Sequence, residues 1–284
     1  MLMPKAQHQT LNMNARSKKM IIKSLVKHKV TRGKYVEHYI KKGYNALPSY
    51  FSKPLETDTL FTFIVGCGHS GTTLMAAKLS NHTDILGIGR ETGVLSQGRH
   101  SLSSIKAILR EWNYFAESYG QSCVLEKTPK HIYSYERVQK VLTNNKFIVM
   151  TRNPLDTIAS LYKRFGDIEY CIDRWNYDNS KALELQNKKN VLFVKYEELT
   201  EEPEKVLKAA LNFLGYTYNN SILEPKDTIY SKTSQKRNMK VREEQVSQSI
   251  KPNKDGWKKI FNKEQSIYIM SRVREVSSKL GYSA

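Results

Sequence analysis

Short apolar segments alternate with amphipathic segments along most of this 284-residue chain. Runs rich in β-branched and aromatic residues predict strands at 60–66, 85–88, 122–127, 146–152 and 190–195. Helical periodicity predicts helices at about 71–80, 102–118, 132–143, 154–165, 169–187 and 203–214, with a last helix at about 263–280. This alternation predicts an α/β fold with three layers, in which helices flank a central parallel sheet.

The two ends of the chain differ in composition from this alternating part. Residues 1–57 are strongly basic, with Glu37 as the only acid before Glu56. We expect a partly helical basic N-terminal extension at 1–57 and one main domain at 58–284, because a chain of this length can bury a sizeable core. Residues 226 to about 254 are polar with few apolar positions. That composition predicts a long loop, either mobile or facing a substrate.

Charge narrows the class of partner. The net charge is +19, which indicates an anionic partner such as a nucleotide, a sulfated or phosphorylated ligand, nucleic acid or an acidic membrane surface. Charge alone does not separate these classes, so the choice among them depends on motifs.

Cysteine usage and hydropathy bear on the compartment. The three cysteines, Cys67, Cys123 and Cys171, have no CxxC spacing. Their pattern argues against a disulfide framework or a zinc site and favours a reducing compartment. No apolar run reaches the length of a transmembrane helix, and the N-terminus lacks the compact apolar core of a signal peptide. We therefore expect a cytoplasmic protein.

The segment after the first predicted strand carries the most informative motif. Between strand and helix, residues 66–73 read Gly-Cys-Gly-His-Ser-Gly-Thr-Thr. Glycines allow close backbone approach, and the N–H groups and dipole at a helix N-terminus favour an anion. The spacing of Gly66 and Gly71 is close to that of a Walker A loop, but Thr72 stands where that loop has its lysine. Such a loop is a poor candidate for the β- and γ-phosphates of ATP.

A second candidate anion site follows the strand at 146–152. Arg152 ends this strand, and Pro154 opens the next helix at a position where proline is favoured. Ser160 and Arg164 lie on one stripe of that helix. These three polar side chains can converge on one phosphate. Taken alone, the pattern fits a surface arginine pair and a serine at the edge of the core equally well.

Two phosphate sites on neighbouring strand ends, without a Walker lysine, indicate a nucleotide with separated phosphates. In this respect the chain resembles the sulfotransferases, which use 3′-phosphoadenosine 5′-phosphosulfate. The resemblance rests on four segments in the family's order between about 60 and 216: GxxxSGTTL at 66–74, TRNPxDxxxS at 151–160, EKTPKH at 126–131 and VKYEEL at 194–199. It is strongest to the branch that contains tyrosylprotein sulfotransferases and bacterial carbohydrate or small-molecule sulfotransferases.

The resemblance implies a set of residues that bind this donor and its product, 3′-phosphoadenosine 5′-phosphate. For the 5′-phosphosulfate they are Gly68, His69, Ser70, Gly71, Thr72 and Thr73; for the 3′-phosphate they are Arg152, Ser160 and Arg164; elsewhere on the nucleotide they are Tyr196, Lys251, Gly256 and Trp257. Trp257 is expected to serve chiefly as an anchor for the last helix. No metal is implied.

The resemblance also implies catalytic residues. Glu91 matches the branch's carboxylate after the second strand and is our candidate general base. Lys127 ends the third strand and is expected to stabilise charge on the transferring group. His69 stands where the branch usually has arginine, so this contact would depend on pH. His131, four residues after Lys127, is expected to be a surface histidine at a helix start.

The predicted function is transfer of a sulfonate to an acceptor hydroxyl of a carbohydrate, a small molecule or a peptide tyrosine, or less readily to an amine. The basic surface favours an acidic acceptor. The alternatives are a P-loop kinase of nucleotides or small molecules, and a non-catalytic basic protein that binds a nucleotide or nucleic acid. Thr72 argues against the kinase. An acid and a base beside the loop at 66–73, Glu91 and Lys127, argue against a protein that only binds its ligand. Nucleic acid is therefore not the expected partner.

Overall fold

The computed structural model describes residues 53–224, 250 and 254–282. Most of the predicted loop at 226–254, including Lys251, and most of the predicted basic extension lie outside the described residues. Residues Lys53–Ala284 form one compact unit, and every contact given below lies within it. Leu55 already pairs with Leu142, so the chain packs on this unit shortly before the first strand.

Five parallel strands form the predicted central sheet. They are β1 (Leu60–Gly66), β2 (Ile85–Gly87), β3 (Cys123–Lys127), β4 (Asn145–Thr151) and β5 (Val191–Lys195), in the spatial order β2-β3-β1-β4-β5. All neighbouring pairs are parallel, so the five carboxyl ends meet at one edge. In open parallel sheets, ligands bind beyond that edge.

Side chains of the central strand alternate between two separate cores, as the period of a strand requires. Leu60 and Ile64 pack with α3 (Thr72–Leu79) and α9 (Pro203–Leu214). Phe61, Phe63 and Val65 pack with α4 (Leu102–Ser118), α5 (Tyr135–Gln139) and the end of α7 (Ile168–Leu183). Helices therefore cover both faces of the sheet, and the predicted three-layer α/β fold is confirmed.

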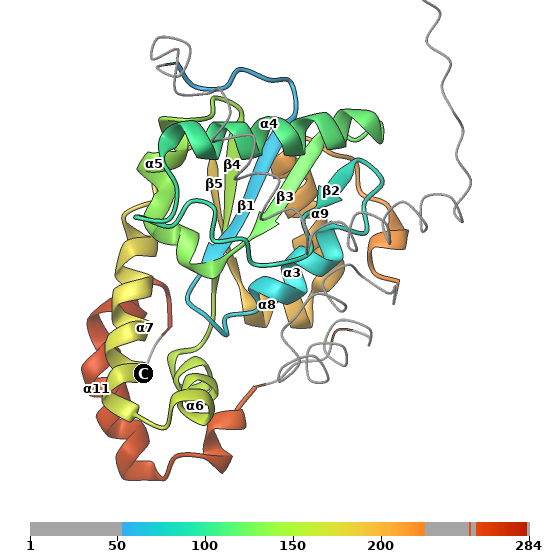
Figure 1. Ribbon diagram of the computed structural model, residues 1–284. Coiled ribbons are helices and arrows are strands. Elements are labelled where there is room, and N and C mark those ends of the chain that lie inside the picture. The colour runs from blue at the N-terminus through green and yellow to red at the C-terminus, as the bar shows by residue number, and fades with distance from the viewer. Residues whose placement is uncertain (1–52, 225–249, 251–253, 283–284) are drawn as a thin grey trace, which may run out of the picture. The chain divides into compact units, whose positions relative to one another are not determined.

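A third core lies beyond the carboxyl ends of the strands. There α6 (Pro154–Phe165), α7 and α11 (Lys263–Lys279) pack together around Trp175, which is fully buried. Figure 1 shows these three helices gathered in the region toward which β1 points. This core supports the segments that follow β1 and β4, where both candidate anion sites lie.

Most predicted elements match within two or three residues, but the helix predicted at 132–143 is wrong. In its place the chain has a 3₁₀ turn, η3 (Pro129–Ser134), and the short helix α5. Leu55 explains the early end of α5, because its N–H donates to the carbonyl of Val141 and its carbonyl accepts from the N–H of Thr143. The short helices α8 (Tyr196–Glu201), η4 (Asn220–Ile222) and η5 (Gly256–Lys259) were not predicted.

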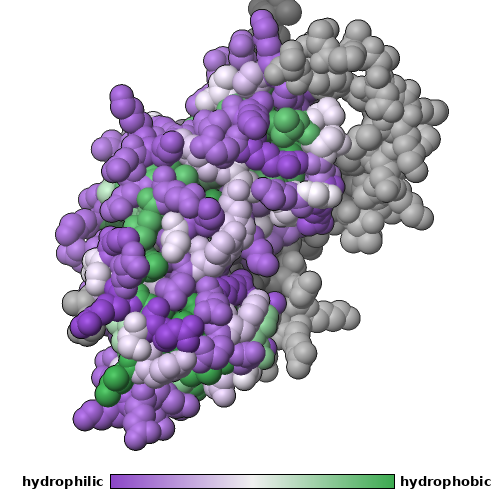
Figure 2. Space-filling model, turned by 90° about the vertical axis from the view of Figure 1, so that its left-hand side faces the viewer, coloured by the Kyte–Doolittle hydropathy of each residue, from purple (hydrophilic) through white to green (hydrophobic). Residues whose placement is uncertain are grey.

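One face of the molecule has a mostly hydrophilic surface. Figure 2 views the side on which α5, α7 and α11 lie in Figure 1; hydrophilic residues cover most of it, and hydrophobic residues show only in small separate patches. Among the described residues, no helix is both long enough and apolar enough to span a membrane.

Candidate active site

The loop after β1 curls tightly because three residues have positive φ angles. These angles are 138° at Gly66, 71° at His69 and 92° at Gly71. A Cβ on Gly66 would lie 2.3 Å from the carbonyl oxygen of Met150 in β4, so only glycine fits there. The loop leads directly into the N-terminus of α3, whose first residue is Thr72. The predicted anion cradle is thus a helix N-terminus preceded by a turn of backbone N–H groups.

Contacts inside the loop hold this shape. The Ser70 hydroxyl donates to the carbonyl of Cys67 over 2.6 Å, and Ser70 is buried. The N–H of Gly68 donates to the carboxylate of Asp178 on α7. The Ser70 hydroxyl and the Gly68 N–H therefore stabilise the conformation of the loop.

The two predicted anion sites touch each other. His69 Nδ1 lies 2.8 Å from Ser160 Oγ on α6, and Arg152 Nη1 donates to the carbonyl oxygen of His69 over 3.3 Å. The loop after β1 and the turn after β4 are adjacent because β1 and β4 are neighbours in the sheet.

Tyr196 joins the same group from the end of β5. The Arg152 guanidinium lies over its ring, 4.3 Å from the centroid, which is a cation–π contact. A Cβ on Gly71 would lie 2.5 Å from Cδ2 of Tyr196. Burial raises the pKa of Tyr196, although Arg152 partly offsets this. Five predicted donor-binding residues, His69, Gly71, Arg152, Ser160 and Tyr196, thus form one connected cluster.

Other predicted donor-binding residues lie around this cluster. Thr72 is buried and Thr73 is half-buried at the start of α3. Arg164 is exposed, and its guanidinium lies 5.3 Å from the centroid of the Phe165 ring. Arg164 lies on α6 as Ser160 does, but its guanidinium contacts the ring of Phe165 and not the cluster.

The described part of the predicted closing segment is fastened to α6. The N–H groups of Asp255 and Trp257 each donate to a carboxylate oxygen of Asp156, both over 3.2 Å. Trp257 is half-buried against the third core, which fits the expected anchor. Gly256 lies between these two N–H groups at the start of η5. Sequence reasoning missed Asp156, although it belongs to the motif at 151–160.

The two predicted catalytic residues form an ion pair. Lys127 Nζ lies 2.7 Å from Glu91 Oε1. The lysine side chain is 2% exposed and that of the glutamate 44%. Lys127 comes from the end of β3, and Glu91 from the segment after β2, the neighbour of β3 in the sheet. A carboxylate and an ammonium therefore stand together at the ligand-binding edge, with the carboxylate open to solvent.

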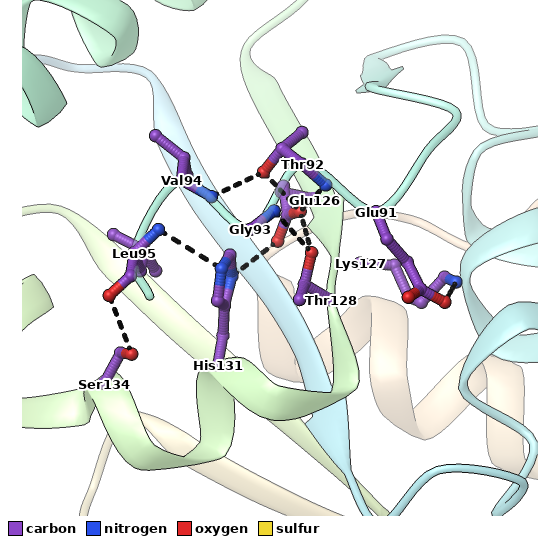
Figure 3. A network of polar contacts seen from close by, with 10 residues as sticks. All are labelled: Glu91, Thr92, Gly93, Val94, Leu95, Glu126, Lys127, Thr128, His131 and Ser134. Atoms are coloured by element: carbon purple, nitrogen blue, oxygen red, sulfur yellow. Dashed lines mark hydrogen bonds and ion pairs between the residues drawn. The ribbon is translucent and has the colours of Figure 1, made fainter. Parts of the chain in front are cut away.

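A second carboxylate, Glu126, lies beside this pair but is buried, and Figure 3 shows the polar network around it. It accepts hydrogen bonds from the hydroxyls of Thr92 and Thr128, over 2.8 and 2.6 Å, and from His131 Nδ1, over 2.9 Å. Burial would raise the pKa of Glu126, but these donors hold it below its ordinary value. The expectation of a surface histidine is wrong, because His131 is completely buried in this network.

On the other side of the loop, α7 contributes a further charged pair that sequence reasoning missed. Arg174 Nε lies 3.6 Å from Asp178 Oδ2, and a Cβ on Gly68 would lie 3.0 Å from Arg174 Nη2. Burial raises the pKa of Asp178 to about 6, although the Cys67 thiol, Lys130 and the Gly68 N–H counteract it. Arg174 therefore brings a guanidinium against a loop that has no lysine or arginine of its own.

Cys67 is no nucleophile in this setting. It is buried, and burial raises the pKa of its thiol well above the ordinary value. The thiolate is the reactive form of cysteine, so Cys67 serves as a small core residue.

A cavity of about 600 Å³ lies between η3 and α7. Tyr133 and Tyr177 line it with ring centroids 5.3 Å apart, and Lys130 and Lys181 also line it. The Tyr133 hydroxyl donates to Asp178, which connects the cavity to the loop after β1. Within the described ranges, no group of three His, Cys, Asp or Glu residues is arranged to hold a metal ion.

Comparison with known proteins gives relatives of one kind. A sequence model of the sulfotransferase family matches residues 99–220, a range that includes Lys127, Arg152 and Tyr196. Protein-tyrosine sulfotransferase A of Caenorhabditis elegans is 26% identical over 206 residues, which are 60% of this chain and 53% of the relative. Protein-tyrosine sulfotransferase 1 of Danio rerio is 27% identical over 212 residues, 61% of this chain and 58% of the relative. The chain thus spans about half the length of these curated relatives.

Solved structures agree at the level of the fold. The sulfotransferase domain of the Synechococcus PCC 7002 olefin synthase superposes with a TM-score of 0.63 at 17% identity, over 82% of this chain and 98% of that domain. The sulfotransferase domain from the curacin biosynthetic pathway gives 0.58 at 17% identity, over 81% and 99%. The predicted P-loop-type fold and the predicted relationship to sulfotransferases are both confirmed.

Proposed function

We propose that this chain, a sulfotransferase by sequence relationship and fold, transfers a sulfonate from 3′-phosphoadenosine 5′-phosphosulfate to an acceptor hydroxyl. One observation carries the proposal: the anion cradle after β1 and the basic turn after β4 meet at the 2.8 Å contact between His69 and Ser160. Two adjacent anion sites suit a nucleotide whose phosphates occupy two separate positions. The donor supplies the activated sulfonate, and the chain binds it, orients it and takes up the acceptor's proton.

The residues of the cluster fit such a donor. The backbone of the loop and the N-terminus of α3 would hold its 5′ end, because both present N–H groups to an anion. Gly71 lets the Tyr196 ring pack against the loop, because a Cβ there would lie 2.5 Å from Cδ2 of Tyr196. Arg152 and Ser160 would hold the 3′-phosphate, and Arg174 would add a positive charge near the transferred group.

Glu91 and Lys127 would carry the chemical step. As the acceptor oxygen bonds to sulfur, the bond from sulfur to the 5′-phosphate oxygen breaks, and that oxygen keeps the electron pair. The acceptor's proton passes to Glu91, which is half-exposed and can meet an incoming hydroxyl. Lys127 lies 2.7 Å from that carboxylate and can neutralise charge on the departing group.

The acceptor to test first is a tyrosine hydroxyl in an acidic peptide. The curated relatives are named for protein tyrosine, and three lysines line the cavity between η3 and α7 against two glutamates: Lys130, Lys181 and Lys188, with Glu136 and Glu184. Simple phenols and sugar alcohols serve as the comparison acceptors.

Calorimetric titration tests the donor. We expect wild type to bind 3′-phosphoadenosine 5′-phosphate tightly and ATP–magnesium weakly. Arg152→Ala should lose about 1.5–3 kcal/mol of binding free energy, because it removes a charge-assisted contact. Arg272→Ala is the matched control, since Arg272 lies on α11 and pairs with Glu169. Preference for ATP–magnesium would support a kinase, and nucleic-acid binding without bisphosphate binding would support a basic binding protein.

Transfer of labelled sulfonate tests the base. Glu91→Gln should bind the bisphosphate as wild type does and lose at least about 100-fold in turnover, since general bases contribute on the order of 10²–10⁴-fold. Glu275→Gln is the control, because it also removes the charge of a glutamate paired with a lysine, on α11. Unchanged turnover in Glu91→Gln would contradict the assignment.

A further inference from the structure

The segment that follows Glu91 has no regular secondary structure, yet its backbone is held by side chains throughout. Four consecutive N–H groups donate to side-chain atoms: Thr92 to Glu126 Oε1 over 3.2 Å, Gly93 to Thr128 Oγ1 over 3.3 Å, Val94 to Thr92 Oγ1 over 3.1 Å and Leu95 to His131 Nε2 over 3.2 Å. Buried N–H groups in loops need such partners, because an unsatisfied one is costly.

All four of these bonds lead to one carboxylate. The hydroxyls of Thr92 and Thr128 donate hydrogen bonds to Glu126 Oε1, and His131 Nδ1 contacts Glu126 Oε2. Glu126 is 1% exposed, so its charge is compensated by these donors. Figure 3 shows the network between the segment at 92–95 and the end of β3.

The direction of every bond in the network is determined by its ends. The N–H of Leu95 can only donate, so His131 Nε2 must accept and carries no hydrogen. An ionised carboxylate can only accept, so His131 Nδ1 must donate to Glu126. Together these bonds place a hydrogen on His131 Nδ1 and an accepting lone pair on Nε2. Both the charge of Glu126 and this tautomer are needed for all bonds to form together.

Glu126 and Lys127 are adjacent in β3, so their side chains point to opposite faces of the sheet. Lys127 binds the Glu91 side chain at 2.7 Å, and Glu126 binds the N–H of the next residue, Thr92, at 3.2 Å. The last two residues of β3 thus hold the Glu91 segment by its side chain and by its backbone.

We propose that Glu126 and His131 are positioning residues for Glu91. By binding the N–H groups of 92–95 they set the place of the Glu91 carboxylate relative to Lys127 and the donor loop. This inference rests on the proposed function of Glu91 as the base. It assigns a role in the reaction to a buried pair that touches neither substrate.

Glu126→Gln is the main test. The amide keeps only one acceptor oxygen, so its NH₂ group would face either the Nδ1–H of His131 or the N–H of Thr92, and the network could not keep all its bonds. We expect turnover to fall about 10- to 100-fold, because small displacements of a catalytic group have effects of that size. Affinity for 3′-phosphoadenosine 5′-phosphate should stay within about twofold of wild type, since the donor cluster is built from other residues. Glu264→Gln, an exposed change on α11, is the control.

His131 allows a matched pair of variants. His131→Gln can still donate to Glu126 and accept from Leu95, whereas His131→Leu can do neither. We expect partial activity from the first and a loss like that of Glu126→Gln from the second. Thr92→Val, which removes only one hydroxyl, should give a smaller loss and serves if the other variants fail to fold. Equal activity in the Gln and Leu variants would overturn the proposal.

A double-mutant cycle separates positioning from a general structural role. If Glu126 acts through Glu91, the double variant Glu91→Gln/Glu126→Gln should be no slower than Glu91→Gln alone. If Glu91→Gln is itself slow and the turnover losses of the two single variants multiply in the double variant, the positioning role is overturned. The assignment of Glu91 as the base would then still stand. Full turnover in Glu91→Gln would refute the base, and with it the premise of the positioning role.

Hydrogen exchange gives a readout that does not depend on activity. Amides 92–95 should exchange faster in Glu126→Gln and His131→Leu, while the amides of β1 keep their protection. Unchanged protection at 92–95 would overturn the proposal even if turnover fell.

Discussion

Single residues of the loop after β1 are constrained by backbone conformation as much as by chemistry. His69 has φ 71°, a conformation that costs a non-glycine residue on the order of 1–2 kcal/mol. Its ring contacts Ser160 and its carbonyl accepts from Arg152. These bonds offset the strain, and they exist only because α6 begins next to the loop. His69 thus joins the loop after β1 to Arg152 and to α6.

Gly71 is predicted to be irreplaceable for two separate reasons. Its φ of 92° disfavours a side chain, and a Cβ there would lie 2.5 Å from Tyr196. Gly120→Ala isolates the first reason, because Gly120 has φ 66° and no atom within 4 Å of its Cβ position. We expect Gly120→Ala to cost about 1 kcal/mol of unfolding free energy and to leave bisphosphate affinity unchanged. Gly71→Ala should cost more and weaken binding at least about tenfold; equal effects of the two variants in denaturation and calorimetry would contradict this.

Asp178 is predicted to make stability depend on pH. Its pKa is raised from 3.8 to about 6 by burial, so the folded state favours the protonated form. The stability from this group is full below pH 4 and is lost as pH rises through 6. The unfolding free energy of wild type minus that of Asp178→Asn should fall by at most about 3 kcal/mol between pH 4 and 7, at about 1.4 kcal/mol per pKa unit. A difference independent of pH in urea denaturation would refute this prediction.

At the scale of elements, the beginning of α6 organises both sides of the site. Asn153 caps this helix through the N–H of Asp156, and its own N–H donates to Glu197 at the start of α8 over 2.9 Å. The Asp156 carboxylate then accepts the N–H groups of Asp255 and Trp257. One helix N-terminus therefore connects β4, α8 and the segment before α11.

Asp156→Asn is predicted to loosen the segment at 254–259 without unfolding the domain. An amide can accept at one atom only, so one of the two N–H groups loses its partner. Hydrogen exchange at 255–257 should accelerate, and bisphosphate affinity should fall by a few-fold, because an exposed hydrogen bond is worth about 1 kcal/mol. Asp173→Asn, on the exposed side of α7, is the control. Unchanged exchange at 255–257 would show that the third core alone holds the segment.

At the scale of the whole molecule, the positive charge is unevenly distributed along the chain. Residues 1–52 hold about half of the net charge of +19, whereas the described candidate residues for donor and catalysis lie in the compact unit Lys53–Ala284. The charge of the extension and the proposed chemistry therefore belong to different parts of the sequence.

A chain that lacks residues 1–52 is predicted to keep the donor site. Its affinity for 3′-phosphoadenosine 5′-phosphate should stay within about twofold of the full chain. Any binding to RNA should weaken and show a smaller dependence on salt, since that dependence scales with the number of phosphates neutralised. Calorimetry and salt titration measure both quantities. Loss of bisphosphate binding in the shortened chain would mean that the extension belongs to the donor site.

Local pattern was enough to predict the strands, most helices and the anion loop. Such patterns involve residues close together in sequence, and they determine the local conformation of the backbone. The apolar alternation of β1 and the spacing of Gly66 and Gly71 are examples. The predicted pairing of strand ends followed from parallel topology alone. The sequence by itself thus determined the fold class, the resemblance to sulfotransferases and the edge of the sheet at which the candidate residues lie.

Only the tertiary structure decided how buried polar groups are partnered. Glu126 and Thr92 are 34 positions apart, and His131 and Leu95 are 36 apart, so no local pattern joins them. The helix predicted at 132–143 failed for the same reason, because Leu55 bonds the carbonyl of Val141 and the N–H of Thr143. Burial makes each unsatisfied polar group costly, and which partner satisfies it depends on segments that meet only after the chain has folded.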